Sequence, residues 1–173
     1  KNGPGVSLAK VQPQRIIDSL QISEGMHIGE VGAGDGYFTF HLSARVGTLG
    51  KIYANDILNS KLDKINDYCK KNSIKNIHTI LGVEMDPQFP EQELDMIVMM
   101  YVFHDLTKPV EFLQKTSKYL KLNAPIVIID QNPDKTGHSF DHFLTTKQVL
   151  NLVKQAGFKI VKILNFLEKD TIY

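Results

Sequence analysis

Short apolar runs alternate with amphipathic stretches along almost the whole chain. Apolar runs with the length of strands fall at 27–31, 51–55, 76–81, 94–102, 125–130 and 158–167. Stretches whose apolar positions recur every three or four residues, as on one face of a helix, fall at 12–20, 37–46, 58–71, 110–120 and 145–156. The central runs are apolar throughout rather than at alternate positions, so helices should cover both faces of those strands. The pattern therefore predicts an α/β fold with a mostly parallel sheet between two helical layers.

The end of the chain departs from this alternation. The run at 158–167 is followed by a polar turn at 168–170 and then by residues 171–173 alone. Such a turn is too short to hold a crossover helix, so the last two strands should be antiparallel. We therefore expect seven strands, with 171–173 as a short antiparallel last strand, and we expect the natural chain to continue a few residues further.

Length and composition place the chain, 1–173, in a single globular domain. Residues 1–10 include Gly3, Pro4 and Gly5 and are expected to form a flexible lead-in. The chain carries 20 Lys and Arg against 19 Asp and Glu, a formal net charge of +1, which gives no general attraction to nucleic acid or to an anionic membrane. Its single cysteine excludes an intrachain disulfide and a cysteine metal cluster.

The apolar runs are also too short for a membrane protein. None approaches the roughly 18–20 residues needed to cross a bilayer, and no signal peptide is visible. We therefore expect a cytoplasmic protein without a membrane span. The chain opens with Lys1 rather than Met, which leaves room for a leader that has been removed.

The strongest chemical signal is a glycine-rich loop between the first strand and the helix that follows it. It reads EVGAGDG from Glu30 to Gly36. Glycines let a ligand approach the backbone closely, and the free N–H groups of the following helix favour a carboxylate or a phosphate. A dinucleotide fingerprint would need a third glycine at position 37, where this chain has Tyr37.

The alternating glycines with an acid two residues before the first resemble motif I of the class I S-adenosylmethionine (SAM) methyltransferases. The resemblance runs from about residue 22 to 167 and implies a Rossmann-like three-layer sandwich. It also implies that Asp56, at the end of the second strand, binds the ribose hydroxyls of SAM. Where the family often has an acid that bonds the adenine amino group, this chain has Val83, so the adenine contact is expected to shift to Glu84 or to backbone groups. The cofactor-binding residues that the resemblance implies are Glu30, Gly32, Ala33, Gly34, Gly36, Asp56, Ile57, Val83, Glu84 and Tyr101.

The segment after the fourth apolar run resembles one branch of this family in particular. Residues 101–106, Lys108-Pro109 and Phe112-Leu113 look like the corresponding stretch of the small-molecule branch that includes ubiquinone and menaquinone methyltransferases. The family's Leu-Lys-Pro-Gly-Gly turn is replaced here by residues 120–124. The resemblance implies methyl transfer from SAM to a small-molecule acceptor by in-line displacement. The alternatives are a nicotinamide-dependent oxidoreductase and a non-catalytic SAM-binding protein.

An acceptor with a hydroxyl group would also need a general base, whereas a carbon, sulfur or arsenic nucleophile can react without one. The candidates, in order, are His104, Asp105, His142 and Tyr101. The group His138, Asp141 and His142 matches no common zinc signature, so we expect no metal site. We expect the N-terminal segment and the loop 131–143 to cover the acceptor. The pattern leaves the oligomeric state open.

Overall fold

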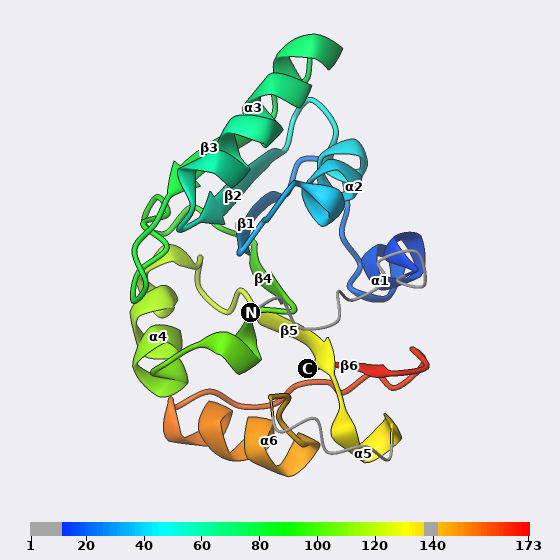
Figure 1. Cartoon of the computed structure of the whole chain (residues 1–173), viewed down its shortest axis with the longest axis vertical. Helices are drawn as coiled ribbons and strands as arrows, with labels where there is room; N and C mark the ends of the chain where they lie inside the picture. The colour runs from blue at the N-terminus through cyan, green and yellow to red at the C-terminus, as the bar shows by residue number, and fades with distance from the viewer. Residues whose placement is uncertain (1–11, 137–141) are drawn as a thin grey trace.

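The computed structural model describes residues 12–136 and 142–173, which form one sheet covered by helices on both faces (Figure 1). The strands of the sheet are β1 (His27–Val31), β2 (Lys51–Asp56), β3 (Ile77–Leu81), β4 (Met96–Met100), β5 (Ile126–Gln131) and β6 (Asp170–Ile172). Their order is β3-β2-β1-β4-β5-β6. The first five are parallel, and β6 is antiparallel to β5.

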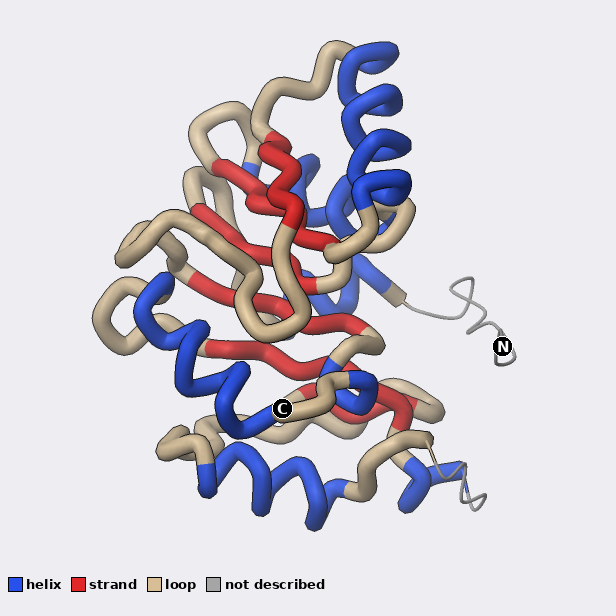
Figure 2. Tube along the Cα trace, turned by 60° about the vertical axis from the view of Figure 1, so that its left-hand side comes forward, coloured by secondary structure: helices blue, strands red, loops and turns tan. Residues whose placement is uncertain are grey.

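The helices fall into two layers, and Figure 2 shows the strands between them. The helices are α1 (Pro13–Ser19), α2 (Tyr37–Val46), α3 (Asn59–Asn72), α4 (Pro109–Thr116), α5 (Pro133–Thr136) and α6 (Thr146–Gln155). Two 3-10 turns are η2 (Phe103–Asp105) and η3 (Ser117–Tyr119). Ile28 and Val98 pack with α1 and α2, whereas Ile97 and Met99 pack with α4 and α6. The predicted three-layer α/β fold is therefore confirmed.

Local sequence signals set the helix ends. Pro109 stands at the start of α4, where its fixed φ suits a helix and its missing N–H costs nothing. The α6 helix begins with a capping box, in which Thr145 Oγ1 accepts from the backbone N–H of Gln148 and the Gln148 side chain accepts from the backbone N–H of Thr145. It ends before Gly157, whose φ of +87° is the left-handed conformation that stops a helix.

The sequence-based expectation of seven strands is wrong, because the described chain has six. The run at 158–167 forms no strand and makes only an isolated bridge between Leu164 and Ile172, and in Figure 1 it runs as a loop from α6 to β6. A strand needs a ladder partner along its length, and β6 offers only three residues, of which Ile172 alone pairs with the run at 158–167. The fourth run is also shorter than expected, since Tyr101 has a φ of +57° and ends the extended backbone of β4.

Two expectations about the end segments have different outcomes. The chain end does pair in the sheet: β6 is antiparallel to β5, and the backbone N–H of Tyr173 donates to the carbonyl of Ile128 at 2.8 Å. The expected lead-in at 1–10 lies outside the described residues. So do residues 1–11 and 137–141 of the two segments expected to cover the acceptor.

The buried chain end should contribute strongly to stability. Ile172 is 2% exposed and packs in the core of the α1 and α2 face. We expect Ile172→Ala to lower the free energy of unfolding by about 2–5 kcal/mol, through lost burial and the cavity left behind. Val161 is 93% exposed, so Val161→Ala is the matched control and should change it by less than about 0.5 kcal/mol. Urea denaturation of the two variants checks this, and equal midpoints would contradict it.

The strand order places the candidate site. Strand β1 lies between β2 and β4, so the chain turns to one side after β1 and reaches the other side only with β4. Open α/β sheets bind ligands at such a switch point, outside the carboxyl ends of the strands. The segments after β1 and β4 meet at this edge.

Candidate active site

The glycine loop turns sharply at the end of β1. Gly32 and Gly34 have φ angles of +70° and +54°, which most other residues adopt only with strain. A Cβ atom on Gly32 would lie 2.3 Å from Cγ2 of Val102, so the loop packs directly against the segment after β4. A Cβ atom on Gly34 would meet nothing within 4 Å. The loop is therefore tight at its first glycine and open at its second.

A small cavity lies beside the open glycine and the start of α2. Its volume is about 270 Å³. Gly36, with a φ of +88°, precedes α2, and no side chain caps the first turn of this helix. The positive end of the helix dipole therefore faces a space that suits an anionic group. The lining residues are Glu30, Gly32, Ala33, Gly34, Asp35, Tyr37, Phe38, Lys61, Met100 and Tyr101.

The carboxylate of Asp56 faces the glycine loop. Its Oδ2 accepts from the backbone N–H of Gly34 at 2.9 Å, and its Oδ1 accepts from that of Leu58, also at 2.9 Å. These two bonds fix the carboxylate at the end of β2, next to the loop. The structure therefore brings Asp56 and the glycine loop together.

Three of the predicted cofactor residues, Ile57, Val83 and Glu84, do not line the cavity. Ile57 and Val83 are exposed at the carboxyl ends of β2 and β3, which are neighbouring strands. Exposed apolar side chains of this size are a surface that an apolar ring can cover. The carboxylate of Glu84 accepts a hydrogen bond from the Thr107 hydroxyl, which ties the segment after β3 to the segment after β4.

Glu30 is a buried acid at the base of the cavity. It is 3% exposed, and its Oε2 accepts from the Thr39 hydroxyl at 2.5 Å. Burial raises the pKa of the Glu30 carboxyl to about 8, because the charged form loses its hydration; the negative charge of Asp56 adds to the effect. The carboxyl is therefore largely protonated at neutral pH in the structure as it stands.

The raised pKa of Glu30 predicts how stability changes with pH. In the folded protein Glu30 keeps its proton up to about pH 8, whereas in the unfolded chain it releases the proton near pH 4.5. The contribution of protonated Glu30 to stability is therefore complete below pH 4.5 and is lost as the pH rises to about 8. We expect the free energy of unfolding to fall across this range by at most about 1.4 kcal/mol per pH unit. Glu30→Gln should flatten this dependence, because an amide does not titrate in this range. Its oxygen can still accept the hydrogen bond from Thr39, so the variant should fold. Denaturation curves at several pH values check this, and an unchanged slope in the variant would refute it.

Tyr101 lines the cavity and is hydrogen-bonded to Asp170 of β6. Its hydroxyl donates to Oδ2 of Asp170 at 2.9 Å. Burial and the neighbouring Asp170 raise the pKa of Tyr101, so its phenol stays neutral and serves as a donor rather than as a base. Burial also raises the pKa of Asp170, whose Oδ1 is buried with no hydrogen-bond partner among the described residues.

His104 is held by Asp130 at the carboxyl ends of β4 and β5. The ring Nδ1 lies 2.8 Å from both carboxylate oxygens of Asp130, and the backbone N–H of His104 donates to Oδ2 at 3.2 Å. Both side chains are only 5% exposed. A carboxylate can only accept, so Nδ1 donates, and in the neutral imidazole Nε2 keeps its lone pair.

The structure brings together three of the four predicted base candidates. His104 Nε2 lies 3.4 Å from Asp105 Oδ2, and His142 Nε2 lies 3.0 Å from Asp105 Oδ1. Tyr101 is turned instead toward Asp170. The other members of the proposed His138 group, His138 and Asp141, lie outside the described residues.

Sequence reasoning missed two acids that shape this end of the site. Asp130 could have been found, because it lies near the end of a strand at the same edge as the glycine loop. Asp170 carries no such signal, since only the antiparallel return of the chain end brings it to Tyr101. The site therefore holds more buried carboxyl groups than the motifs indicate.

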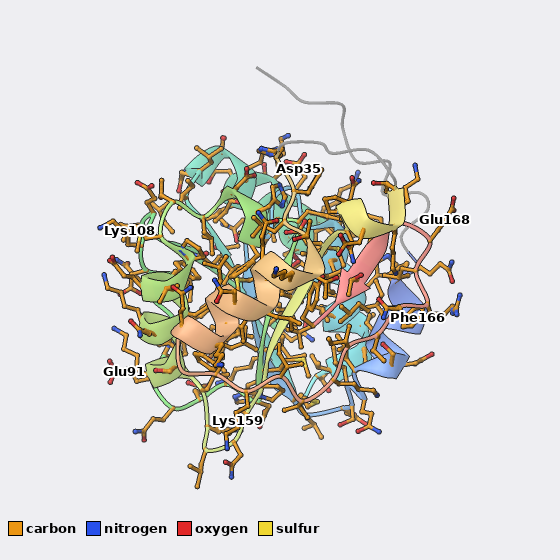
Figure 3. The ribbon with its side chains drawn as sticks, turned by 90° about the horizontal axis from the view of Figure 1, so that it is seen from below. Asp35, Glu91, Lys108, Lys159, Phe166 and Glu168 are labelled. Carbon is orange, nitrogen blue, oxygen red and sulfur yellow. The ribbon has the colours of Figure 1, made fainter. Side chains whose placement is uncertain are left out.

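A larger hollow lies elsewhere. Its volume is about 810 Å³, and it is lined mostly by β5, the segment before it and the segment that follows α6. Lys159 lines it, and Figure 3 places Lys159 at the opposite end of the view from Asp35 of the glycine loop. The hollow holds none of the predicted site residues.

Known proteins resemble this chain in sequence and in structure. A family model described as "Methyltransferase domain" matches residues 22–172. A demethylmenaquinone methyltransferase of Staphylococcus carnosus is 26% identical over 121 residues, which are 70% of this chain and 49% of that protein. A fibrillarin-like rRNA/tRNA 2'-O-methyltransferase of Pyrobaculum islandicum is 26% identical over 171 residues, covering 91% of this chain and 67% of that protein. The chain thus spans about half the length of the quinone relative.

The structural match concerns the fold. A SAM-dependent methyltransferase from Aquifex aeolicus superposes with a TM-score of 0.87 at 24% identity, covering 95% of this chain and 89% of that chain. In the part of the chain that the structure describes, every helix is too short or too polar to cross a membrane.

Proposed function

The chain belongs to the family of methyltransferase domains, and we propose that it transfers a methyl group from SAM to a small-molecule acceptor at the carboxyl edge of its sheet. The observation that carries this proposal is the glycine loop, whose open Gly34 borders a cavity at the uncapped start of α2. Family membership also agrees with the resemblance in the motifs, which span the same residues.

The cavity fits the amino-acid end of SAM. The uncapped first turn of α2 would bind the carboxylate, and the acid of Glu30 would lie near the amino group. The positively charged amino group of SAM would favour the charged form of Glu30, so bound SAM should lower the raised pKa of this acid.

The neighbouring strand ends fit the nucleoside. Asp56, already fixed beside Gly34, would accept from the ribose hydroxyls. The exposed apolar surfaces of Ile57 and Val83 would cover the two faces of adenine, and Glu84 lies next to them in sequence. These roles are proposals for residues that the sequence motifs already single out.

The chemistry that SAM supplies when bound is a methyl carbon on a positively charged sulfur. The chain has to hold donor and acceptor in line and exclude water. For an acceptor with an acidic O–H, we assign the general base to His104. Its Nε2 would take the hydroxyl proton, which frees an oxygen electron pair to act as the nucleophile, and bound SAM would supply the methyl group, its sulfur retaining the electrons of the C–S bond. Asp130 is a positioning residue that fixes the imidazole through Nδ1.

The remaining candidates receive lesser roles. Tyr101 borders the cavity and donates to Asp170, so it shapes the wall between donor and acceptor. Asp105 and His142 lie beside His104 but are more than half exposed. Deprotonation of a phenol also makes its ring carbons nucleophilic, so the same base would serve methylation at oxygen or at carbon.

A specific observation supports a second candidate acceptor, the ribose 2'-hydroxyl of RNA. The fibrillarin-like relative covers more of this chain than the quinone relative does. The charge balance of 20 basic and 19 acidic residues, with Arg15 and Arg45 as the only arginines, favours a small molecule, because RNA binding draws on an excess of positive charge.

The test is a screen for S-adenosylhomocysteine formation. The purified chain is incubated with SAM and, in separate reactions, phenols and quinols, thiols, amines, and structured RNA. We expect product with an acidic hydroxyl compound and none with RNA. Product with RNA alone would favour the second candidate. SAM binding without product in any reaction would mean a non-catalytic binding protein, and NADH oxidation with a carbonyl compound would favour an oxidoreductase.

A further inference from the structure

Three side chains at the far end of the site present ligand atoms to one another. They are His104 and Asp105 of η2 and His142, and among the described residues their ligand atoms all lie within 4.8 Å of one another. The rings of His104 and His142 meet edge to face, with centroids 4.7 Å apart. Methyl transfer as proposed above uses only one of the three, so the grouping needs another explanation.

The orientation of His104 suits a metal ligand. Nδ1 donates to the buried carboxylate of Asp130, which leaves a lone pair on Nε2, 3.4 Å from Oδ2 of Asp105. A lone pair this close to a carboxylate oxygen is repelled by it unless a proton or a cation lies between them. Metal-ligating histidines usually donate their other N–H to a carboxylate or carbonyl in this manner, and that bond fixes the ring and increases its basicity.

The spacing of the ligand atoms is close to that around a tetrahedral ion. Two ligands at about 2.0–2.1 Å from such an ion lie about 3.3–3.4 Å apart. Nε2 of His104 lies 3.4 Å from Oδ2 of Asp105, Nε2 of His142 lies 3.0 Å from Oδ1 of the same carboxylate, and the ligand atoms of all three lie within 4.8 Å of one another. Asp105 is 58% exposed and His142 is 64% exposed, so both can adjust around a rigidly held His104.

The donor set selects the class of ion. Two imidazole nitrogens and one carboxylate suit zinc and neighbouring transition metals, whereas Mg²⁺ and Ca²⁺ prefer oxygen ligands throughout. Three protein ligands leave a fourth position for water. The exposure of Asp105 and His142 gives solvent access to that position.

We propose that His104, Asp105 and His142 bind a divalent transition-metal ion of the zinc class. Binding of the ion does not depend on the proposed reaction, but the effect of the bound ion on activity rests on the proposed function. A single lone pair on His104 cannot both ligate the ion and accept a proton, so an occupied site removes the general base. The ion therefore inhibits methyl transfer to hydroxyl acceptors, and a chelator restores it.

The test measures binding directly, with neither SAM nor an acceptor present. The chain is stripped with a chelator, dialysed and titrated with Co²⁺, whose tetrahedral complexes absorb far more strongly in the visible than its octahedral ones. We expect an intense band that saturates at one ion per chain and disappears when Zn²⁺ is added. Since the assay involves no methyl transfer, its failure would leave the proposed function standing, and the reverse also holds.

Variants decide which residues bind the ion. We expect His142→Ala and Asp105→Asn each to weaken Co²⁺ binding at least about 10-fold, and Asp130→Asn to weaken it about 10–100-fold through the lost support of His104. His142 and Asp105 are exposed, so both of their variants should fold. His78, an exposed histidine on β3, provides the control, and His78→Ala should bind normally. The absence of a saturable band, or equal affinity in all variants, would overturn the proposal and leave a hydrogen-bonded cluster.

Discussion

Replacing Gly34 with valine is expected to abolish SAM binding while the chain still folds. A Cβ atom at this position would meet nothing within 4 Å, and Gly34 lines the cavity, so the valine side chain would enter open space there. In the proposed complex that space belongs to the methionine portion of SAM. We expect the dissociation constant for SAM to rise at least about 100-fold, which corresponds to about 2.7 kcal/mol. Isothermal titration calorimetry measures it.

Gly157 offers a closely matched control. It too has a positive φ, +87°, and a Cβ atom there would also meet nothing within 4 Å. It follows α6 and borders the large hollow rather than the glycine loop. Gly157→Val should therefore suffer similar backbone strain, on the order of 1–2 kcal/mol, and bind SAM normally. If the two variants lost binding equally, strain rather than the cavity would explain the loss, and the assignment of the cavity to SAM would be wrong.

Removing the imidazole of His104 is expected to have the largest effect on the rate. For an acceptor with a weakly acidic hydroxyl, His104→Ala should lower kcat about 10²–10⁴-fold and leave the dissociation constant for SAM unchanged. The assay contains a chelator, so that the cation-free protein is measured. Asp130→Asn should lower kcat by a smaller factor, because the ring remains but loses its fixed orientation.

The acidity of the acceptor separates a chemical role of His104 from a structural one. An acceptor that is already ionised at the assay pH needs no base, so the loss in His104→Ala should shrink steadily as the pKa of the acceptor falls. A merely structural role would lower the rate by the same factor for every acceptor. An equal loss across a series of phenols would therefore remove His104 from the role of base.

The sequence predicted the part of the site that depends on local backbone chemistry. The EVGAGDG loop lies between β1 and α2 because its glycines accept positive φ values there, and Gly32 and Gly34 do so. Asp56 was singled out because it stands at the end of the second strand, at a fixed distance along the chain from the loop. In the structure it accepts a hydrogen bond from Gly34 of that loop. Such features can be predicted because each requires only a residue type at a fixed place in a strand–turn–helix unit.

The sequence did not predict features that depend on distant pairing. The run at 158–167 has the apolar content of a strand, but a strand forms only where a neighbour supplies ladder bonds, and β6 is too short to do so. The bond between His104 and Asp130 joins the ends of β4 and β5, and its distance and burial could not be read from spacing along the chain. The approach of His142 to Asp105 is equally non-local.

Calorimetric titration of the chain with SAM and with NADH is the most direct test of whether the loop between β1 and α2 binds SAM. We expect one SAM bound per chain with micromolar affinity, comparable binding of S-adenosylhomocysteine, and no heat of binding with NADH. Saturable binding of NADH without binding of SAM would contradict this expectation.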